Sequence, residues 1–334
     1  MANVTGEQLV EWTRRAFPDR APKTRAAHAS GISVTGVFRP SPTGAALCTA
    51  PFLTRGTVDV LGRFSNGSGR AAQRDRDSDA RGLALKFFAG TADEMDLVAM
   101  TLALFFVDRP EDFEAFTAAS VPVPRSEFEV SFWEKIKLSA QLKLPPEPPE
   151  ADLDADLSPA RLVEYAKTHP ECKTAIGMLA GLIKPVSLGR ATYHGVHTFL
   201  IVDPAGQVRP IRYKWSPLTG SQDLGDDLGD RDQHYLHDEL RTRLAREPIR
   251  FALNFVMADQ GDPLDRPTAL WPVARRRVSA GTLELTDVVE DQESGERMGF
   301  NPTRVGGGFE LSDDPVLRAR GAAYTTSWAD RDGS

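Results

Sequence analysis

The chain has 334 residues, of which 41% are hydrophobic and 26% charged, and its formal net charge is -7 at pH 7. This length fits one large domain or two ordinary ones and is enough to bury a core and enclose a cofactor. The acidic balance argues against a nucleic-acid binder, which needs basic residues on phosphates, and against binding to an anionic membrane surface.

The sequence also lacks the features of a secreted or membrane protein. We find no apolar run long enough for a signal peptide or a membrane span. The two cysteines, Cys48 and Cys172, give neither a disulfide framework nor the spacing of metal ligands. We therefore expect a protein of the reducing cytoplasm.

The first half of the chain predicts one helix followed by strands. Leu9, Trp12 and Phe17 share one side of an amphipathic helix at the N-terminus. Short β-rich runs separated by Gly, Pro and Ser follow, and a proline-rich stretch then precludes regular structure, which we interpret as an exposed connection. The predicted helix covers residues 7–17, the runs cover 33–38, 56–64 and 82–88, a buried segment continues over 96–107, and the connection is 144–159.

The second half predicts three helices with strands between them. Ser158 caps the first of these helices with Pro159 at its first position, and Pro248 ends the second. Asp313, Asp314 and Pro315 begin the third. The helices are expected over 159–169, 228–247 and 315–331, and the strands over 197–203, 208–215, 249–258 and 282–290. Because the strands follow one another through turns, we expect an α+β fold with an antiparallel β-barrel and surrounding helices.

Two patterns suggest chemistry. His28 lies in a run of small residues, three positions after Arg25. Arg320 precedes Tyr324 by four residues, so both side chains share one helix face, and a guanidinium beside a phenol favours the phenolate that ferric haem accepts as a ligand. Spacing alone favours a surface pair instead. Paired histidines at 194 and 197 and at 234 and 237 lack a third metal ligand nearby in sequence.

Eight ordered blocks between residues 25 and 331 resemble the sequence patterns of catalases. The blocks read RAAHASG, GRFSNGSG, DARGLALKFF, MDLVAMTLALFFVDRPEDF, YHGVHTF, DRPTALWP, FNPTRVGGG and RARGAAY. Each block is weak alone, but their order over nearly the whole chain is a strong signal. The resemblance to the catalase superfamily implies one catalase-like haem domain over residues 1–334, with haem b as cofactor.

The resemblance also implies a role for individual residues. His28 would be the distal acid–base group above the iron and Tyr324 the axial iron ligand, kept ionised by Arg320. The remaining residues implied in cofactor binding are Arg25, Arg63 and Arg331 at the haem propionates, Phe113 stacked on the porphyrin, and Phe105 and Phe106 in the distal channel. For each phenylalanine, plain core packing stays the alternative.

One departure from the family pattern bears on activity. Catalases usually carry an asparagine in the run that here reads Asp96–Leu–Val–Ala–Met100–Thr101, and Met100 occupies that position unless the register slips by one to Thr101. Asparagine can donate a hydrogen bond to peroxide, and a thioether cannot. We therefore expect weak oxygen release, with electrons drawn instead from a small organic donor.

The size of the chain completes the hypothesis. It resembles the minimal class called catalase-related peroxidases, without the C-terminal helical domain of larger catalases. We expect a homodimer, no NADPH site, and peroxide with a small organic donor as partners. A biosynthetic enzyme that rearranges a hydroperoxide or oxidises a pathway intermediate is the second reading. A haem carrier is the third, against which His28 argues because a carrier needs no acid–base group.

Overall fold

The structure is a computed structural model in which residues 4–17, 23–75, 77, 79–90, 94–121, 160–182, 184–224, 231–232 and 234–332 are described. The predicted connection at 144–159 lies outside the described residues, and so does the helix start at Ser158 and Pro159. The helix expected over 228–247 lies partly outside them.

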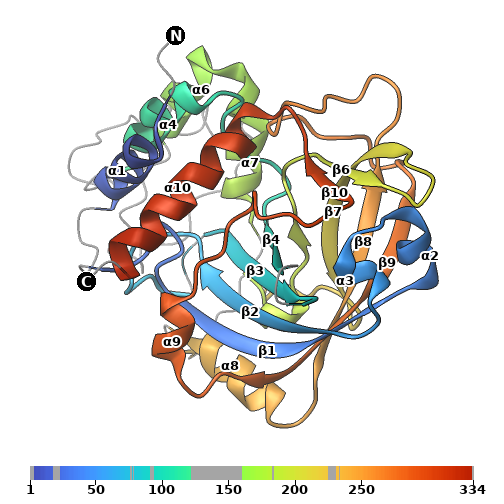
Figure 1. Cartoon of the computed structure of the whole chain (residues 1–334). Helices are drawn as coiled ribbons and strands as arrows, with labels where there is room; N and C mark the ends of the chain where they lie inside the picture. Colours follow the sequence, from blue (N-terminus) through green and yellow to red (C-terminus); the bar gives the residue numbers. More distant parts are fainter. Residues whose placement is uncertain are drawn as a thin grey trace.

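A closed antiparallel β-barrel forms the centre of the molecule (Figure 1). The ring runs β7-β5-β4-β3-β2-β1-β9-β8 and closes where β8 pairs with β7, while β6 and β10 extend the sheet from β7. The predicted fold class is therefore confirmed. The strands are β1 Gly31–Pro40, β2 Val58–Asn66, β3 Arg81–Phe88, β4 Glu94–Met100, β5 Tyr193–His194, β6 Phe199–Val202, β7 Val208–Pro217, β8 Ile249–Met257, β9 Arg277–Val288 and β10 Phe309–Leu311.

Strand register sorts the side chains onto two faces. Phe64, Phe87 and Trp215 are fully buried members of the main hydrophobic cluster, in which aromatic rings pack edge to face, at a tilt and stacked. On each strand, the residues directly before and after these point to the opposite face, because side chains alternate along a strand. Directly paired residues share a face, so one row on that second face runs across four strands as Ser65, Gly82, Met100 and His194.

Helices cover this second face. In Figure 1 the long helix α10 lies beside the barrel, next to β2, β3 and β4, and α1, α4 and α6 lie on the far side of α10. Thr5 and Gln8 form a capping box at the start of α1, and Arg14 on α1 pairs with Asp330 on α10. The helices are α1 Gly6–Ala16, α2 Pro42–Leu47, α3 Pro51–Thr54, α4 Phe113–Ala119, α6 Ala160–Thr168, α7 Lys173–Ala180, α8 Tyr235–Leu244, α9 Gln292–Arg297 and α10 Pro315–Asp332.

A buried ion pair ties β3 and β4 to the loop that leads into β10 and α10. The Nζ atom of Lys86 lies 2.8 Å from Oδ1 of Asp96, and neither side chain is more than 2% exposed. The other carboxylate oxygen of Asp96 accepts a hydrogen bond of 2.8 Å from the backbone N–H of Asn301. The backbone N–H of Asp96 in turn donates to the carbonyl of Arg304.

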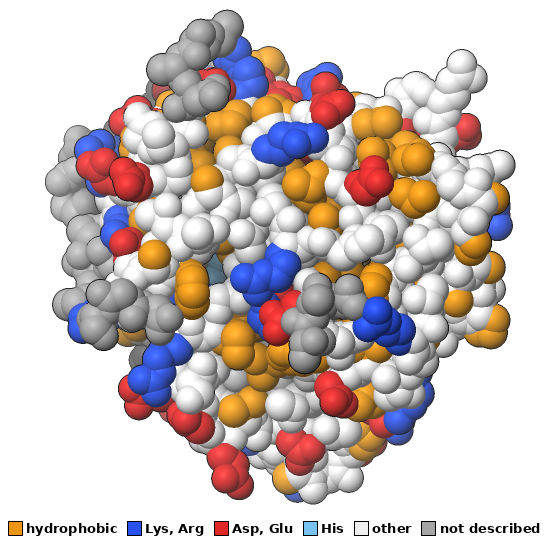
Figure 2. Space-filling view, in the orientation of Figure 1, with side chains coloured by type: hydrophobic (Ala, Val, Ile, Leu, Met, Phe, Trp, Pro, Cys, Tyr) orange, Lys and Arg blue, Asp and Glu red, His pale blue; other side chains and the backbone are white. Residues whose placement is uncertain are grey.

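The surface agrees with the composition. On the face shown in Figure 2, basic and acidic side chains are interspersed, and neither sign forms a continuous patch over the described residues. No helix in the described part of the chain combines the length and the apolar character that a membrane span requires.

Candidate active site

His28 lies in a strained but fully supported backbone conformation. Its φ of 58° is in the left-handed region, which is unfavourable for a residue other than glycine. Its backbone N–H donates to the carbonyl of Gly67, and the next N–H donates to the carbonyl of Ser68. The imidazole lies over Gly82, where an added Cβ would come within 2.9 Å of Nδ1. The glycine in the ARGLALKFF run therefore makes room for this histidine.

The contacts of the imidazole fix its tautomer. The Nδ1 atom lies 2.9 Å from the backbone oxygen of Asn66 and 3.0 Å from Oγ of Ser65. A carbonyl oxygen only accepts, so Nδ1 carries the proton and Nε2 keeps a free lone pair. Burial, reinforced by the charges of Arg63 and Arg320, lowers the pKa of His28 to about 4. The ring is therefore a neutral base at pH 7.

A hydrogen-bonded chain leads to Tyr324 on α10. Nη2 of Arg320 donates to the phenol oxygen of Tyr324 at 2.8 Å, and Nη1 donates to Nε2 of His197 at 2.8 Å. Because the guanidinium of arginine cannot accept a hydrogen bond, Nε2 of His197 is unprotonated. The proton of the His197 ring is therefore on Nδ1, which donates to Asp314 at 2.6 Å. Burial lowers the pKa of His197 to about 4 against the opposing effect of Asp314. The chain holds the guanidinium in place against the tyrosine oxygen.

His197 and Asp314 are two site residues that the sequence analysis missed. In the sequence, His197 forms only a weak candidate metal pair with His194, and Asp314 is only part of a helix start. Asp314 does begin α10, since its Oδ1 accepts from the backbone N–H groups of Val316 and Leu317, and its second oxygen serves His197. The signal that could have indicated these two residues was the HTF motif at residues 197–199, taken together with the Arg–x–x–x–Tyr motif at residues 320–324. Among the described residues, no cluster of three or more His, Cys, Asp or Glu side chains could hold a metal ion.

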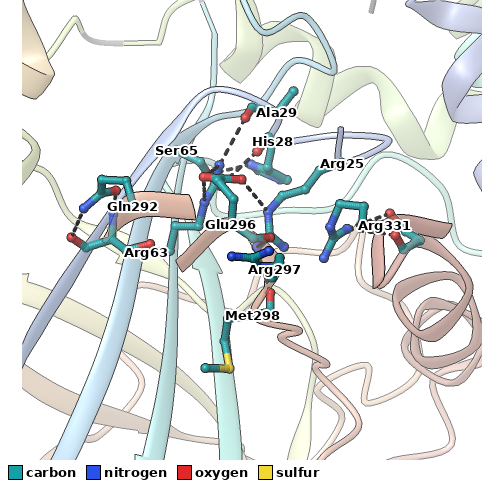
Figure 3. A network of polar contacts seen from close by, with 12 residues as sticks. Arg25, His28, Ala29, Arg63, Ser65, Gln292, Glu296, Arg297, Met298 and Arg331 are labelled. Atoms are coloured by element: carbon teal, nitrogen blue, oxygen red, sulfur yellow. Dashed lines mark hydrogen bonds and ion pairs between the residues drawn. The ribbon is translucent and has the colours of Figure 1, made fainter. Parts of the chain in front are cut away.

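The structure brings the predicted arginines together from three parts of the chain. Arg25 and Arg63 lie on either side of Glu296 near His28, and Arg331 lies beyond Arg25 (Figure 3). Arg63 is 3% exposed and donates to the backbone oxygens of His28 and Ala29. Arg331 is close enough to Arg25 for its charge to lower the pKa of Arg25, although burial contributes most to the value of about 9.

The predicted aromatic residues form a cluster beside Arg320. The Phe105 ring lies 5.1 Å from the guanidinium carbon of Arg320 and stacks on Phe113 at 6.1 Å between centroids. Phe106 stacks on Phe116 at 4.6 Å. The contacts of Phe105 are thus with the Arg320–His197 side, and its assignment to a distal channel stays a prediction, as does that of Phe106.

Met100, the last residue of β4, and Thr101, which follows it, lie in different environments. Met100 is on the face of Ser65 and Gly82, the two residues that contact the His28 imidazole, and it packs against the hydrophobic cluster that contains Phe105 and Phe116. The hydroxyl of Thr101 instead accepts from the backbone N–H of Arg81 at 3.0 Å. The geometry favours Met100 as the residue that faces the site.

These residues fit a tyrosine-ligated haem. A phenol oxygen held by a guanidinium is a ligand for ferric haem, buried arginines suit two carboxylates, and flat aromatic side chains suit a porphyrin. The neutral Nε2 of His28 comes from the barrel side and Tyr324 from α10. They are close enough that Arg320, which contacts Tyr324, lowers the pKa of His28.

Comparisons with known proteins agree with this fit. Residues 4–142 and 146–334 match the family described as Catalase. The chain is 31% identical over 309 residues to a "Catalase-related peroxidase" of Mycolicibacterium paratuberculosis, covering 92% of this chain and 88% of that protein. It is 25% identical to a "Catalase-related peroxidase" of Synechococcus elongatus, covering 91% and 82%. It is 26% identical to "Catalase-3" of Arabidopsis thaliana, covering 95% of this chain and 61% of that protein. The chain therefore belongs to the catalase family.

Proposed function

We propose that this oxidoreductase of the catalase family is a haem b-dependent peroxidase. It reduces hydrogen peroxide or an organic hydroperoxide with electrons from a small organic donor and releases little oxygen. The observation that carries the proposal is Met100 on the face of the barrel that contacts His28, where a residue able to hydrogen-bond would be needed to orient a second peroxide. Two relatives with the printed name "Catalase-related peroxidase" support it.

The residues of this chain would divide the work between two sides of the cofactor. Tyr324 would hold the iron, Arg25, Arg63 and Arg331 would bind the two propionates, and Phe113 would pack on the ring. Bound haem would supply the redox-active iron at which peroxide is reduced.

The proton chemistry belongs to His28. Its unprotonated Nε2 can accept a proton from the peroxide and return it to the leaving oxygen as water departs. Ser65 and the carbonyl of Asn66 hold Nδ1, so the ring keeps its orientation and tautomer through both transfers. On the other side, Arg320 donates a hydrogen bond to the phenol oxygen of Tyr324, with His197 and Asp314 behind it.

The first experiment compares oxygen release from hydrogen peroxide with oxidation of a dye donor by the haem-loaded protein. We expect rapid dye oxidation and little oxygen. The variant Met100→Asn should raise oxygen release by about tenfold, the effect of one good hydrogen bond in the second peroxide step. Met100→Leu is the matched control and should leave oxygen release unchanged. Vigorous oxygen release by the wild-type protein, or no gain in Met100→Asn, would contradict the role given to Met100.

A second candidate function rests on the apolar surroundings of Met100. The thioether packs against a hydrophobic cluster that contains Phe105 and Phe116, and such surroundings suit an organic hydroperoxide at least as well as hydrogen peroxide. The enzyme would then rearrange a hydroperoxide or oxidise a biosynthetic intermediate. Turnover of an organic hydroperoxide in the absence of any donor would favour this function over the peroxidase.

The remaining expectations stay predictions. A homodimer in the cytoplasm without an NADPH site is consistent with the proposal but is not needed for it. Sedimentation of the haem-loaded protein would measure the oligomeric state directly.

A further inference from the structure

A single carboxylate is shared by two of the arginines assigned to the cofactor. Glu296 on α9 lies between Arg63 and Arg25 (Figure 3). Its Oε1 accepts from Nε of Arg63 at 2.7 Å and lies 2.6 Å from Nη2, and its Oε2 accepts from Nε of Arg25 at 3.4 Å. Arg25 also donates to the backbone oxygens of Glu296 and Met298.

The three side chains differ in exposure. The side chain of Arg63 is 3% exposed and that of Arg25 11%, whereas that of Glu296 is 39% exposed. Burial lowers the pKa of both arginines, and the charge of Glu296 acts in the opposite direction on each. The two guanidinium groups are therefore held inside the protein, and Glu296 is the one of the three side chains that is exposed to solvent.

Helix α9 has little freedom to move its carboxylate away. Gln292 bonds to the backbone of Ser33 on β1 in both directions, at 2.8 Å and 3.0 Å. Gly295 packs so closely on Ser33 that an added Cβ would come within 2.3 Å of its Oγ, and Asp291 caps the helix. The position of Glu296 is thus built into the fold through β1.

We propose that Glu296 is an internal counter-ion of the cofactor site, and that its negative charge weakens the binding of carboxylates to Arg25 and Arg63. This inference rests on the proposed function, in which the same arginines bind the propionates of haem. A carboxylate beside them competes for the same N–H groups and repels the incoming anions. Glu296 stabilises two like charges that lie close together, but its own charge weakens the binding of haem.

The test is a titration of the cofactor-free protein with haem, followed by Soret absorbance. Glu296→Gln keeps an oxygen for Nε of Arg63 but removes the charge, and we expect its dissociation constant to fall about tenfold. The melting temperature of the cofactor-free variant should fall more than that of the haem-loaded variant. Glu293→Gln is the matched control, because Glu293 is on the same helix, is 81% exposed and pairs only with Arg297 among the described residues. It should change neither value.

Haem dimethyl ester, which lacks the two carboxylates, isolates the proposed interaction. With this probe the difference between wild type and Glu296→Gln should disappear. Equal affinities of both proteins for haem itself, or weaker binding by Glu296→Gln, would overturn the inference and leave the proposed function intact. A wild-type chain that does not bind haem would overturn the proposed function as well. If Glu296→Gln does not fold, Glu296→Asp can be used instead, because it moves the charge away from the arginines by one methylene. This variant should bind haem about threefold more tightly. Unchanged affinity of Glu296→Asp would also overturn the inference.

Discussion

At the scale of single residues, His28 shows how neighbours can set the chemistry of an imidazole. Its Nδ1–H is committed to Asn66, its backbone oxygen is held by Arg63, and its left-handed φ is supported from both sides by residues 67 and 68. The result is a neutral ring with one basic nitrogen. A surface histidine would be partly protonated near pH 6.5 and would lose that basicity.

This environment predicts the pH dependence of catalysis. Burial and the charges of Arg63 and Arg320 lower the pKa of His28 from 6.5 to about 4. The imidazole therefore stays neutral as the pH falls through 6.5, and the acid limb of kcat/KM should lie near pH 4. Initial rates in short assays between pH 3.5 and 8 would measure it. An acid limb near pH 6.5 would show that His28 is not kept neutral or is not the base.

At the scale of secondary-structure elements, the buried pair of Lys86 and Asp96 joins β3, β4 and the loop at 301–304. A buried ion pair is weak evidence for stability, but removing one partner leaves a buried charge without compensation. Because Asp96 also binds the backbone of Asn301, its loss would loosen the approach to α10 and Tyr324.

Asp96→Asn should therefore lower the free energy of unfolding by about 3–5 kcal/mol. Urea denaturation measures the loss. Glu94→Gln is the matched control, since its carboxylate is 43% exposed and 3.9 Å from Lys86, and it should cost less than about 1 kcal/mol. Equal effects of the two variants would mean that the charge on Lys86 is compensated elsewhere.

The strands and the end helices were predictable because each carries its own local pattern. Residues 33–38, 56–64 and 82–88 fall within β1, β2 and β3, apart from two residues before β2, and the Asp–Asp–Pro signal correctly places the start of α10. The segment 96–107 is a strand only as far as Met100, where the chain turns towards the aromatic cluster. The short helices α2, α3 and α9 were missed, because four to six residues are too few for a periodic pattern.

The site residues that lie in the catalase-like sequence blocks could be predicted from that resemblance. Contacts between segments that are distant in the sequence could not. Asp314 and His197 were visible in the sequence, but nothing local indicates that they contact each other. Glu296 likewise looks like an ordinary charge on a polar run. Its contact with Arg63 depends on the pairing of β1 with β2 and on the attachment of α9 to β1, which only the folded chain reveals.

At the scale of the whole molecule, three histidines are held in the neutral form at pH 7. Burial is the main cause that lowers the pKa of His28, His194 and His197 to about 4 each, from 6.5. Between pH 6.5 and 4 these three histidines bind more protons in the unfolded chain than in the folded one, so their contribution to stability falls as the pH falls through this window.

The melting temperature should therefore drop between pH 6.5 and 4, and His194→Gln should make the drop shallower. His194 is the suitable position because it lies outside the networks of His28 and Tyr324; its pKa is also lowered by the charges of Lys214 and Arg277. Calorimetry at several pH values measures the slope. An unchanged slope in His194→Gln would assign the acid sensitivity to other groups.

The site is assembled from segments that lie far apart along the chain. Arg25 reaches the backbone of Met298 across 273 residues, and Arg14 on α1 reaches Asp330 across 316. During synthesis on a ribosome, which proceeds from the N-terminus at about 5–20 residues per second, His28 emerges tens of seconds before Tyr324. A newly made chain therefore cannot complete the site until α10 leaves the exit tunnel. Until then, the barrel is unfinished and the arginines that are buried in the folded protein are exposed. Haem loading therefore has to wait until Tyr324 and the rest of α10 have been synthesised.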